Sequence, residues 1–327
     1  MQMRRLGRTG RQVSAVGLGA WQLGADWGPV AADDARQVLA AAVETGITLI
    51  DTADVYGDGR SEQFVGEALA QPAGGDLFVA TKLGRRVEQR PEHYRLDNFR
   101  SWLDRSRRNL GVDTIDLVQL HCPPPAVYAD DRVFDALDTL VDEGIVRAYG
   151  VSVETCAEAL AAIDRKGVAT VQIILNCFRH RPLDEVLPAA QAAGVGILAR
   201  VPLASGLLSG RYDLTTSFAA DDHRSFNRRG EAFDVGETFA GVPYEVGLAA
   251  VRDLAGAVPE SMTMAQFALR WILDQPGVST VIPGARDADQ VAGNAAVADL
   301  PPLTAGQHEA VRSVYDRHIR PHVHHRW

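Results

Sequence analysis

The chain is poor in cysteine, and it has no sequence feature of a secreted or membrane-bound protein. Its three cysteines are Cys122, Cys156 and Cys177, an odd number without Cys-x-x-Cys spacing. That pattern argues against a disulfide framework and against a thiolate zinc site, so we expect isolated, reduced thiols. The basic start of the chain is not followed by the apolar core of a signal peptide, and no apolar run approaches the length of a bilayer. We therefore expect a cytoplasmic protein without a membrane partner.

The chain also has fewer basic than acidic residues. The 327 residues include 33 Lys and Arg against 42 Asp and Glu, which gives a formal net charge of -9. An overall negative field repels nucleic acids and anionic lipid surfaces, so we expect no nucleic-acid partner. The hydrophobic share of 46% is ordinary for a globular chain that buries a sizeable core. Because we find no internal linker or low-complexity segment, we expect residues 1–327 to form a single domain.

Short β-branched runs alternate with longer amphipathic stretches along the chain. The runs predict strands at residues 15–18, 47–50, 77–81, 115–120, 147–151, 170–175, 196–199 and 279–282. The amphipathic stretches predict helices at 34–45, 61–69, 96–110, 132–143, 155–166, 183–193 and 287–297. Most of the predicted strands are apolar on both faces, as parallel strands covered by helices must be.

This alternation fits both a closed (β/α)8 barrel and a doubly wound open sheet. The usual dinucleotide-binding turn of the open sheet, Gly-x-Gly-x-x-Gly after the first strand, is absent. We therefore predict an α/β protein with a single (β/α)8 TIM barrel. A hairpin within residues 3–13 is expected to close the barrel floor, and a helix at 303–318 is expected to begin at Thr304. Strands seven and eight are separated by a long insert, residues 201–278, whose polar stretch 213–238 we expect to be functional.

Polar side chains follow four of the predicted strands at the point where each strand ends. They are Asp51, Lys82, His121 and Ser152, and Tyr56 lies five residues after Asp51. In an α/β barrel these strand ends converge on one mouth, so we expect the side chains to face a common cavity.

The combination of side chains has an evident chemical use. A phenol is a poor acid at neutral pH, but an ammonium such as Lys82 beside Tyr56 lowers the pKa of the phenol. A carboxylate such as Asp51 is needed to hold a buried Lys82 charged and oriented. His121 can then donate to or polarise a carbonyl oxygen. Each residue alone is often structural, whereas the four together at one mouth favour a catalytic site.

A series of motifs extends this pattern over nearly the whole chain. They are the stretch from Arg5 to Trp21, Asp51-Thr-Ala-Asp-Val-Tyr56-Gly, Thr81-Lys82-Leu, Leu120-His121-Cys-Pro, Gly150-Val-Ser152, Pro202-Leu-Ala-Ser-Gly-Leu-Leu-Ser-Gly210 and Ile282-Pro-Gly-Ala-Arg286. In this order they resemble the bacterial-type members of the aldo-keto reductase superfamily.

The resemblance implies the same barrel, without a Rossmann domain, and an NADP(H)-dependent reduction of an aldehyde or ketone to an alcohol. It makes Tyr56 the general acid, Lys82 the partner that lowers the pKa of Tyr56, Asp51 the partner of Lys82, and His121 the group that orients the carbonyl. The implied partner is a small carbonyl or alcohol substrate, and the implied assembly is a monomer or a small homo-oligomer.

The resemblance also implies a set of cofactor-binding residues. Those expected to line the nicotinamide and substrate side are Gly19, Ala20 and Trp21. Those expected to hold the ring amide are Ser152, Gln172 and Asn176. Those expected along the ring face and the pyrophosphate are Arg200, Val201, Leu203, Ser205, Gly206, Leu208, Ser209, Gly210 and Arg211. Those expected from the eighth strand to the adenosine end are Ile282, Gly284, Arg286, Gln290 and Asn294.

Three positions depart from the common pattern of the family. Val153 stands where many relatives have Asn, which leaves Ser152 and Gln172 to bind the ring amide. Arg200 stands where an aromatic ring often stacks on the nicotinamide. A guanidinium can stack in the same way, or Arg200 can be a strand-end charge paired with an acid. Arg286 is the only cation near the adenosine end, so NAD(H) remains a weaker alternative to NADP(H).

Two further functions stay open at this stage. The same chemistry run in the oxidative direction would make the protein an alcohol or sugar dehydrogenase. A cofactor-sensing regulatory subunit is the other alternative, which the complete catalytic set and the short segment before the predicted hairpin disfavour. The loops expected to choose the substrate are residues 21–27, 124–131 and 213–238.

The histidine-rich tail is the last feature to interpret. His322, His324 and His325 have no carboxylate or thiolate at ligand spacing, so we expect no metal site there. The adjacent Trp327 either docks back toward the mouth or only anchors the tail.

Overall fold

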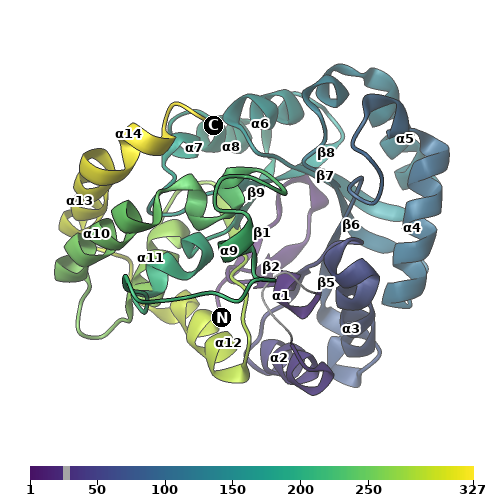
Figure 1. Ribbon diagram of the computed structural model, residues 1–327. Helices are drawn as coiled ribbons and strands as arrows, with labels where there is room; N and C mark the ends of the chain where they lie inside the picture. The colour runs from purple at the N-terminus through teal and green to yellow at the C-terminus, as the bar shows by residue number, and fades with distance from the viewer. Residues whose placement is uncertain (25–29) are drawn as a thin grey trace.

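Eight parallel strands form one sheet whose hydrogen-bonded order follows the chain. The computed structural model describes residues 1–24 and 30–327. The strands are β3 (Leu18–Gly19), β4 (Leu49–Asp51), β5 (Phe78–Leu83), β6 (Ile115–His121), β7 (Val146–Ser152), β8 (Val168–Ile174), β9 (Gly196–Arg200) and β10 (Val278–Val281). Parallel bridges also join Val16 to Val281 and Gly19 to Gly284, so the first and last strands meet and the sheet closes (Figure 1). The predicted (β/α)8 barrel is confirmed.

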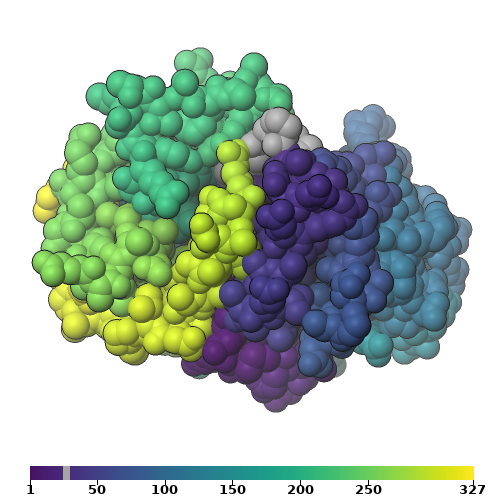
Figure 2. All heavy atoms as spheres, turned by 90° about the horizontal axis from the view of Figure 1, so that it is seen from below, coloured from purple at the N-terminus to yellow at the C-terminus, as the bar shows by residue number. Residues whose placement is uncertain are grey.

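Helices between successive strands, and one after the last strand, cover the outside of the barrel (Figure 1). They are α2 (Ala32–Glu44), α3 (Arg60–Leu69), α4 (Leu96–Leu110), α5 (Asp131–Asp142), α6 (Cys156–Ile163), α7 (Arg181–Asp184), α8 (Val186–Ala193) and α12 (Ala288–Ala295). The apolar face of each helix packs on the barrel, and local signals set the ends. Thr155, for example, caps α6 in a reciprocal pair of hydrogen bonds with Glu158. Figure 2 shows α12 beside α2, as barrel closure requires.

The hairpin closes the barrel floor as expected. It consists of β1 (Met3–Arg5) and β2 (Gln12–Ser14), which pair antiparallel. Leu6 and Val13 are fully buried and pack against the inward-facing side chains of the strands. Gly7 lies so close to β9 that a Cβ atom there would be 2.1 Å from the amide nitrogen of Gly196. The hairpin can therefore approach the strands this closely only because residue 7 has no side chain.

The insert between β9 and β10 consists of irregular chain and three helices. They are α9 (His223–Phe226), α10 (Tyr244–Leu254) and α11 (Met264–Leu273). The polar stretch 213–238 contains only α9 and short turns, which is why it showed no helical pattern in the sequence.

The predicted C-terminal helix is interrupted. Thr304 caps α13 (Ala305–Val314) as expected. Residues 315–319 then form a wider π-type turn that leads into α14 (Arg320–Val323). Pro321 explains the change, because it has no N–H to continue the α-helical hydrogen bonds.

The described residues form no helix that is both long and apolar enough to cross a membrane.

Candidate active site

A cavity of about 1240 Å³ opens where the carboxyl ends of the strands converge. The polar residues expected just after the strands are in fact part of them. Asp51, His121, Ser152 and Arg200 are the last residues of β4, β6, β7 and β9, and Lys82 lies one residue before the end of β5. The strands extend into these polar positions because main-chain pairing does not depend on side-chain polarity.

Lys82 links Asp51 to Tyr56 beneath the cavity. Its ammonium donates to Asp51 Oδ2 at 2.6 Å and to the carbonyl of Thr52 at 2.8 Å. The same nitrogen lies 3.3 Å from the hydroxyl of Tyr56. Lys82 is only 1% exposed and Asp51 only 4%, so the ion pair is shielded from water. The structure thus places the predicted acid, amine and phenol in direct contact.

Burial has the largest effect on the titration of Tyr56. It raises the pKa of the phenol above the ordinary value of 10.0, although the positive charge of Lys82 acts to lower that pKa. The predicted influence of Lys82 therefore has the expected sign, but it does not outweigh desolvation. Burial is the largest single influence on Lys82 and acts to lower its pKa, but the charges and hydrogen bonds of Asp51 and Tyr56 together outweigh it, so the pKa of Lys82 is raised. At neutral pH the site holds an ammonium beside a neutral phenol.

His121 completes the predicted group. Its ring meets the ring of Tyr56 edge-on, with centroids 6.0 Å apart. Burial lowers the pKa of His121 well below its usual value, and the positive charges of Arg85 and Lys82 add to the effect. Within the described part of the chain its Nδ1 has no hydrogen-bond partner. The imidazole is therefore neutral and has unused hydrogen-bonding capacity.

Two glutamines, one of them missed by the sequence reasoning, position Asp51. Gln172 Nε2 donates to Asp51 Oδ1 at 2.7 Å, and Gln119 Nε2 approaches the same oxygen at 3.3 Å. Gln172 was expected to bind the ring amide. In this structure it lines the cavity while its amide group holds the carboxylate. Gln119 stands in the middle of a predicted apolar strand, and that polar interruption was its only signal.

Most residues of the expected cofactor set line this cavity. Those that do are Gly19, Trp21, Ser152, Gln172, Arg200, Val201, Leu203, Ser205, Gly206, Ser209, Arg211, Ile282, Gly284, Arg286, Gln290 and Asn294. Those that do not line it are Ala20, Asn176, Leu208 and Gly210. Asn176 is fully buried, and both ends of its amide bind main chain: Nδ2 donates to Val201, and Oδ1 accepts from Phe178. Its amide therefore supports the cavity wall.

The far end of the cavity lies at the start of α12. Asp287 caps this helix by accepting from the amide of Gln290, and the Gln290 side chain in turn accepts from the amide of Arg286. The side chain of Arg286 is 47% exposed, and its guanidinium lies 3.9 Å from Asp222 of the insert. The end of the cavity expected to hold adenosine thus contains a cation with an acid nearby.

Comparison with known proteins decides the family. The model of the aldo/keto reductase family matches residues 15–316. The chain belongs to the aldo/keto reductase family. It is therefore an oxidoreductase.

Individual members of the aldo/keto reductase family match over most of their length. The chain is 31% identical over 295 residues to the aldo-keto reductase YhdN of Bacillus subtilis, covering 89% of this chain and 87% of that protein. The solved glycerol dehydrogenase AKR11B4 from Gluconobacter oxydans is 32% identical with a TM-score of 0.80, over 97% of this chain and 96% of that one. The holo form of aldo-keto reductase AKR11C1 from Bacillus halodurans is 28% identical with a TM-score of 0.76, over 97% and 99%.

A residue of the insert decides between the two roles left open for Arg200. Arg200 forms a buried ion pair with Glu237 and donates to the carbonyl of Val153 at 2.9 Å. Of the two readings of Arg200, the structure shows the paired charge, and the guanidinium still lines the cavity. Nothing in the sequence links Arg200 to Glu237, because the two are far apart and the insert has no periodic pattern.

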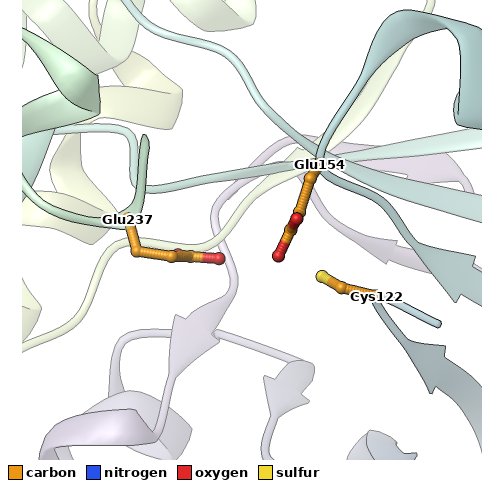
Figure 3. A group of neighbouring side chains, drawn as sticks. All are labelled: Cys122, Glu154 and Glu237. Carbon is orange, nitrogen blue, oxygen red and sulfur yellow. The ribbon is translucent and has the colours of Figure 1, made fainter. Parts of the chain in front are cut away.

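A second ion pair lies beside the first. Arg85 and Glu154 meet at 3.0 Å, and Figure 3 shows Glu154, Glu237 and Cys122 turned toward one another. The ligand-type atoms of these three residues lie within 4.8 Å of one another, the kind of grouping that can hold a metal ion. Here Arg200 and Arg85 already neutralise the two carboxylates, so the charge balance does not favour a cation. We describe the group as an ion-pair cluster in the cavity wall.

The short helix α1 (Trp21–Gly24) and the insert meet over Tyr56. Trp21 stacks on Tyr56 with ring centroids 6.0 Å apart, and Phe233 of the insert meets Trp21 edge-on at 5.9 Å. The insert therefore contacts the mouth, as expected for a substrate-choosing segment. The predicted substrate loop 21–27 extends beyond Gly24, and its remainder lies outside the described residues.

Asp54 is a buried acid that the sequence reasoning did not single out. Its carboxyl group is fully buried, and neither oxygen has a hydrogen-bond partner within the described residues. Burial, with a smaller contribution from the charge of Glu62, raises the pKa of Asp54 from 3.8 to about 7. Asp54 is therefore largely protonated below neutral pH.

Asp54→Asn should make the stability of the protein less dependent on pH. An acid whose pKa is higher in the folded protein than in the unfolded chain destabilises the fold as pH rises between the two values, here 3.8 and about 7. One pKa unit corresponds to about 1.4 kcal/mol, so wild type should lose about 2–3 kcal/mol relative to the variant between pH 5 and pH 8. Urea unfolding at both pH values measures the difference. An equal stability gap at pH 5 and pH 8 would contradict a protonated Asp54.

Proposed function

We propose that the protein reduces an aldehyde or ketone to the alcohol, with NADPH as the hydride donor and Tyr56 as the general acid. The observation that carries this proposal is the buried contact of Lys82 with both Asp51 and Tyr56 at the cavity. NADPH, when bound, supplies the hydride that reaches the carbonyl carbon. The residues of the chain must orient the carbonyl oxygen and deliver a proton to it.

In this proposal each side chain has one task. His121 is neutral and lines the cavity, so its ring can hydrogen-bond the carbonyl oxygen. Tyr56 keeps its proton at neutral pH and can transfer it to that oxygen as negative charge develops. Lys82 then faces the phenolate that remains and stabilises it. Asp51 keeps Lys82 charged and in place.

Reduction is the direction that the site favours. Oxidation of an alcohol needs Tyr56 as a base, which requires its phenolate. Burial raises the pKa of Tyr56 and so disfavours the phenolate in the free protein. A dehydrogenase remains the second candidate, supported by the 32% identity to a glycerol dehydrogenase.

The cavity fits an extended nicotinamide dinucleotide with a phosphorylated adenosine end. Its lining runs from Tyr56 and His121 at the reacting end to Arg286 and Asn294 at α12. Arg286 supplies the positive charge that a 2′-phosphate requires, while Asp222 and Asp287 reduce the net charge there. We therefore propose NADP(H) as the preferred cofactor, with NAD(H) as a weaker one.

A kinetic comparison of the two cofactors tests both the reaction and the cofactor assignment. A panel of aldehydes, ketones and sugars should give loss of NADPH absorbance, with a higher kcat/KM for NADPH than for NADH. Arg286→Ala should weaken the binding of NADPH by about ten- to a hundredfold, which is the usual contribution of a guanidinium–phosphate contact. It should hardly change the binding of NADH. NADH serves as the internal control. Equal kcat/KM of wild type with the two cofactors would show that Arg286 does not recognise the phosphate. An equal loss of affinity for both cofactors in the variant would show the same.

A further inference from the structure

Trp327 is buried against the insert. Its indole is 6% exposed, and its N–H donates to the carboxylate of Asp234 at 3.1 and 3.3 Å from the two oxygens. The guanidinium carbon of Arg179 lies 3.5 Å from the centre of the indole ring. Figure 1 shows the C-terminal segment leading from α14 back toward α7 and α8. Of the two roles left open for Trp327, neither is decided by its contacts alone: the indole packs against residues of two other segments and does not line the cavity.

The indole satisfies a guanidinium that is otherwise poorly solvated. Arg179 is buried, and its Nε and Nη2 have no hydrogen-bond partner within the described residues. Burial lowers the pKa of Arg179 to about 9, while the charge of Asp234 acts in the opposite direction. The face of an indole attracts a desolvated cation, so Trp327 and Arg179 stabilise each other's position.

The main chain of the insert is shaped around this indole. Gly241 has φ of 77°, and a Cβ atom there would lie 2.3 Å from an atom of the Trp327 ring. The residue at this position must therefore be small and must tolerate a left-handed backbone. A tail that rested loosely on the surface would not impose such a restriction.

A short series of contacts connects the indole to the cavity. Asp234 accepts from the amide of Gly236 at 2.7 Å and so begins the turn that ends at Glu237. Glu237 pairs with Arg200, and its carbonyl accepts from Ser205 at 3.0 Å. Asp234 and Glu237 line the cavity, whereas Trp327 does not. Trp327 can therefore influence the cavity only through the segment that it holds.

The insert also has internal contacts near the other end of the cavity. There Arg224 binds Asp222 at 2.8 Å and donates to the hydroxyl of Tyr212 at 2.6 Å. Asp222 is also the residue near Arg286. Phe233, next to Asp234 in the chain, instead contacts Trp21 above Tyr56. These contacts lie near opposite ends of the cavity, and Asn227 joins them, because its Oδ1 accepts from the amides of Ala232 and Phe233.

We propose that Trp327 is a positioning residue for the carbonyl-binding end of the cavity, which it shapes by fixing residues 232–237 through Asp234 and Arg179. This inference rests on the proposed function for the identity of that end. Loss of the indole should loosen residues 232–237 and weaken binding of the carbonyl substrate. It should leave the adenosine end and the proton-transfer group in place.

The first experiment measures amide hydrogen exchange in wild type and in Trp327→Ala and needs no substrate. Amides of residues 232–241 should exchange at least about tenfold faster in the variant, while those of α12 (Ala288–Ala295) should change little. Trp327→Phe retains an aromatic face for Arg179 but loses the N–H donor, so it should give an intermediate exchange rate and guards against a folding failure of the alanine variant. Unchanged exchange at 232–241 in both variants would overturn the proposal, whether or not the protein proves to be a reductase.

The second experiment separates substrate binding from catalysis. With the best carbonyl compound of the panel, Trp327→Ala should raise the KM at least about fivefold, keep kcat within about twofold and keep the Kd for NADPH within about twofold. Trp102→Ala, which removes a partly buried indole from α4, is the matched control and should change none of the three. Faster exchange with an unchanged KM, or an equal rise in KM in the control, would overturn the positioning role. If no carbonyl compound turns over, the proposed function fails, and the exchange experiment alone decides whether Trp327 holds the segment.

Discussion

Replacing Tyr56 by Phe is expected to lower kcat by about 10² to 10⁴, the usual worth of general acid catalysis. The change removes only the hydroxyl group, which lies 3.3 Å from the ammonium of Lys82. The ring keeps its stacking on Trp21, so folding and NADPH affinity should be close to those of wild type. Steady-state kinetics, with NADPH binding followed by fluorescence, measures both quantities.

The Tyr56→Phe variant discriminates between a catalytic and a structural phenol. A kcat within about fivefold of wild type would show that another group supplies the proton. A large loss of NADPH affinity would show instead that the hydroxyl supports the cofactor.

Replacing Lys82 by Met should reduce kcat to a similar extent and should also destabilise the fold. The methionine leaves the Asp51 carboxylate buried without its cation, which typically costs about 3–5 kcal/mol. Gln172 and Gln119 still donate to Asp51 and should moderate that cost. Activity and the free energy of unfolding, measured on the same preparation, test the two effects together.

A double variant separates the two roles of Lys82. Adding Asp51→Asn to Lys82→Met removes the uncompensated charge, so stability should recover in part while activity stays low. If activity returned together with stability, the loss in the single variant would have been a folding defect. If Lys82→Met alone remained fully active, the ammonium would have no part in proton transfer.

The barrel could be predicted from sequence because its strands must be apolar on both faces. Eight such runs, with no Gly-x-Gly-x-x-Gly turn, were sufficient to choose the architecture. Strand ends were harder to predict, because Asp51, His121 and Arg200 belong to the strands despite their polarity. The break at residues 315–319 was missed because the helical pattern was taken to continue to residue 318, although Pro321 was a visible signal.

The convergence of Asp51, Tyr56, Lys82 and His121 could also be predicted, because strand order and strand direction fix which residues meet at the mouth. The partners of these residues could not. Glu237 reaches Arg200, and Asp234 reaches Trp327, only through the course of an irregular insert. Asn176 matched a family position by spacing, yet it does not line the cavity, and its amide bonds to main chain. Spacing along a sequence identifies a position, and packing determines what the side chain there can contact.

Isotope transfer tests the central claim most directly. The protein is incubated with the best carbonyl compound of the panel and with NADPH that carries deuterium on one face of C4, each face in a separate reaction. We expect one of the two labelled forms to deliver a single deuterium to the carbinol carbon of the alcohol, with NADP⁺ formed in equal amount, and Tyr56→Phe to slow this transfer about 10² to 10⁴-fold. Alcohol without deuterium from either labelled form, or no alcohol from any compound of the panel, would contradict the assignment of the protein as an NADPH-dependent carbonyl reductase.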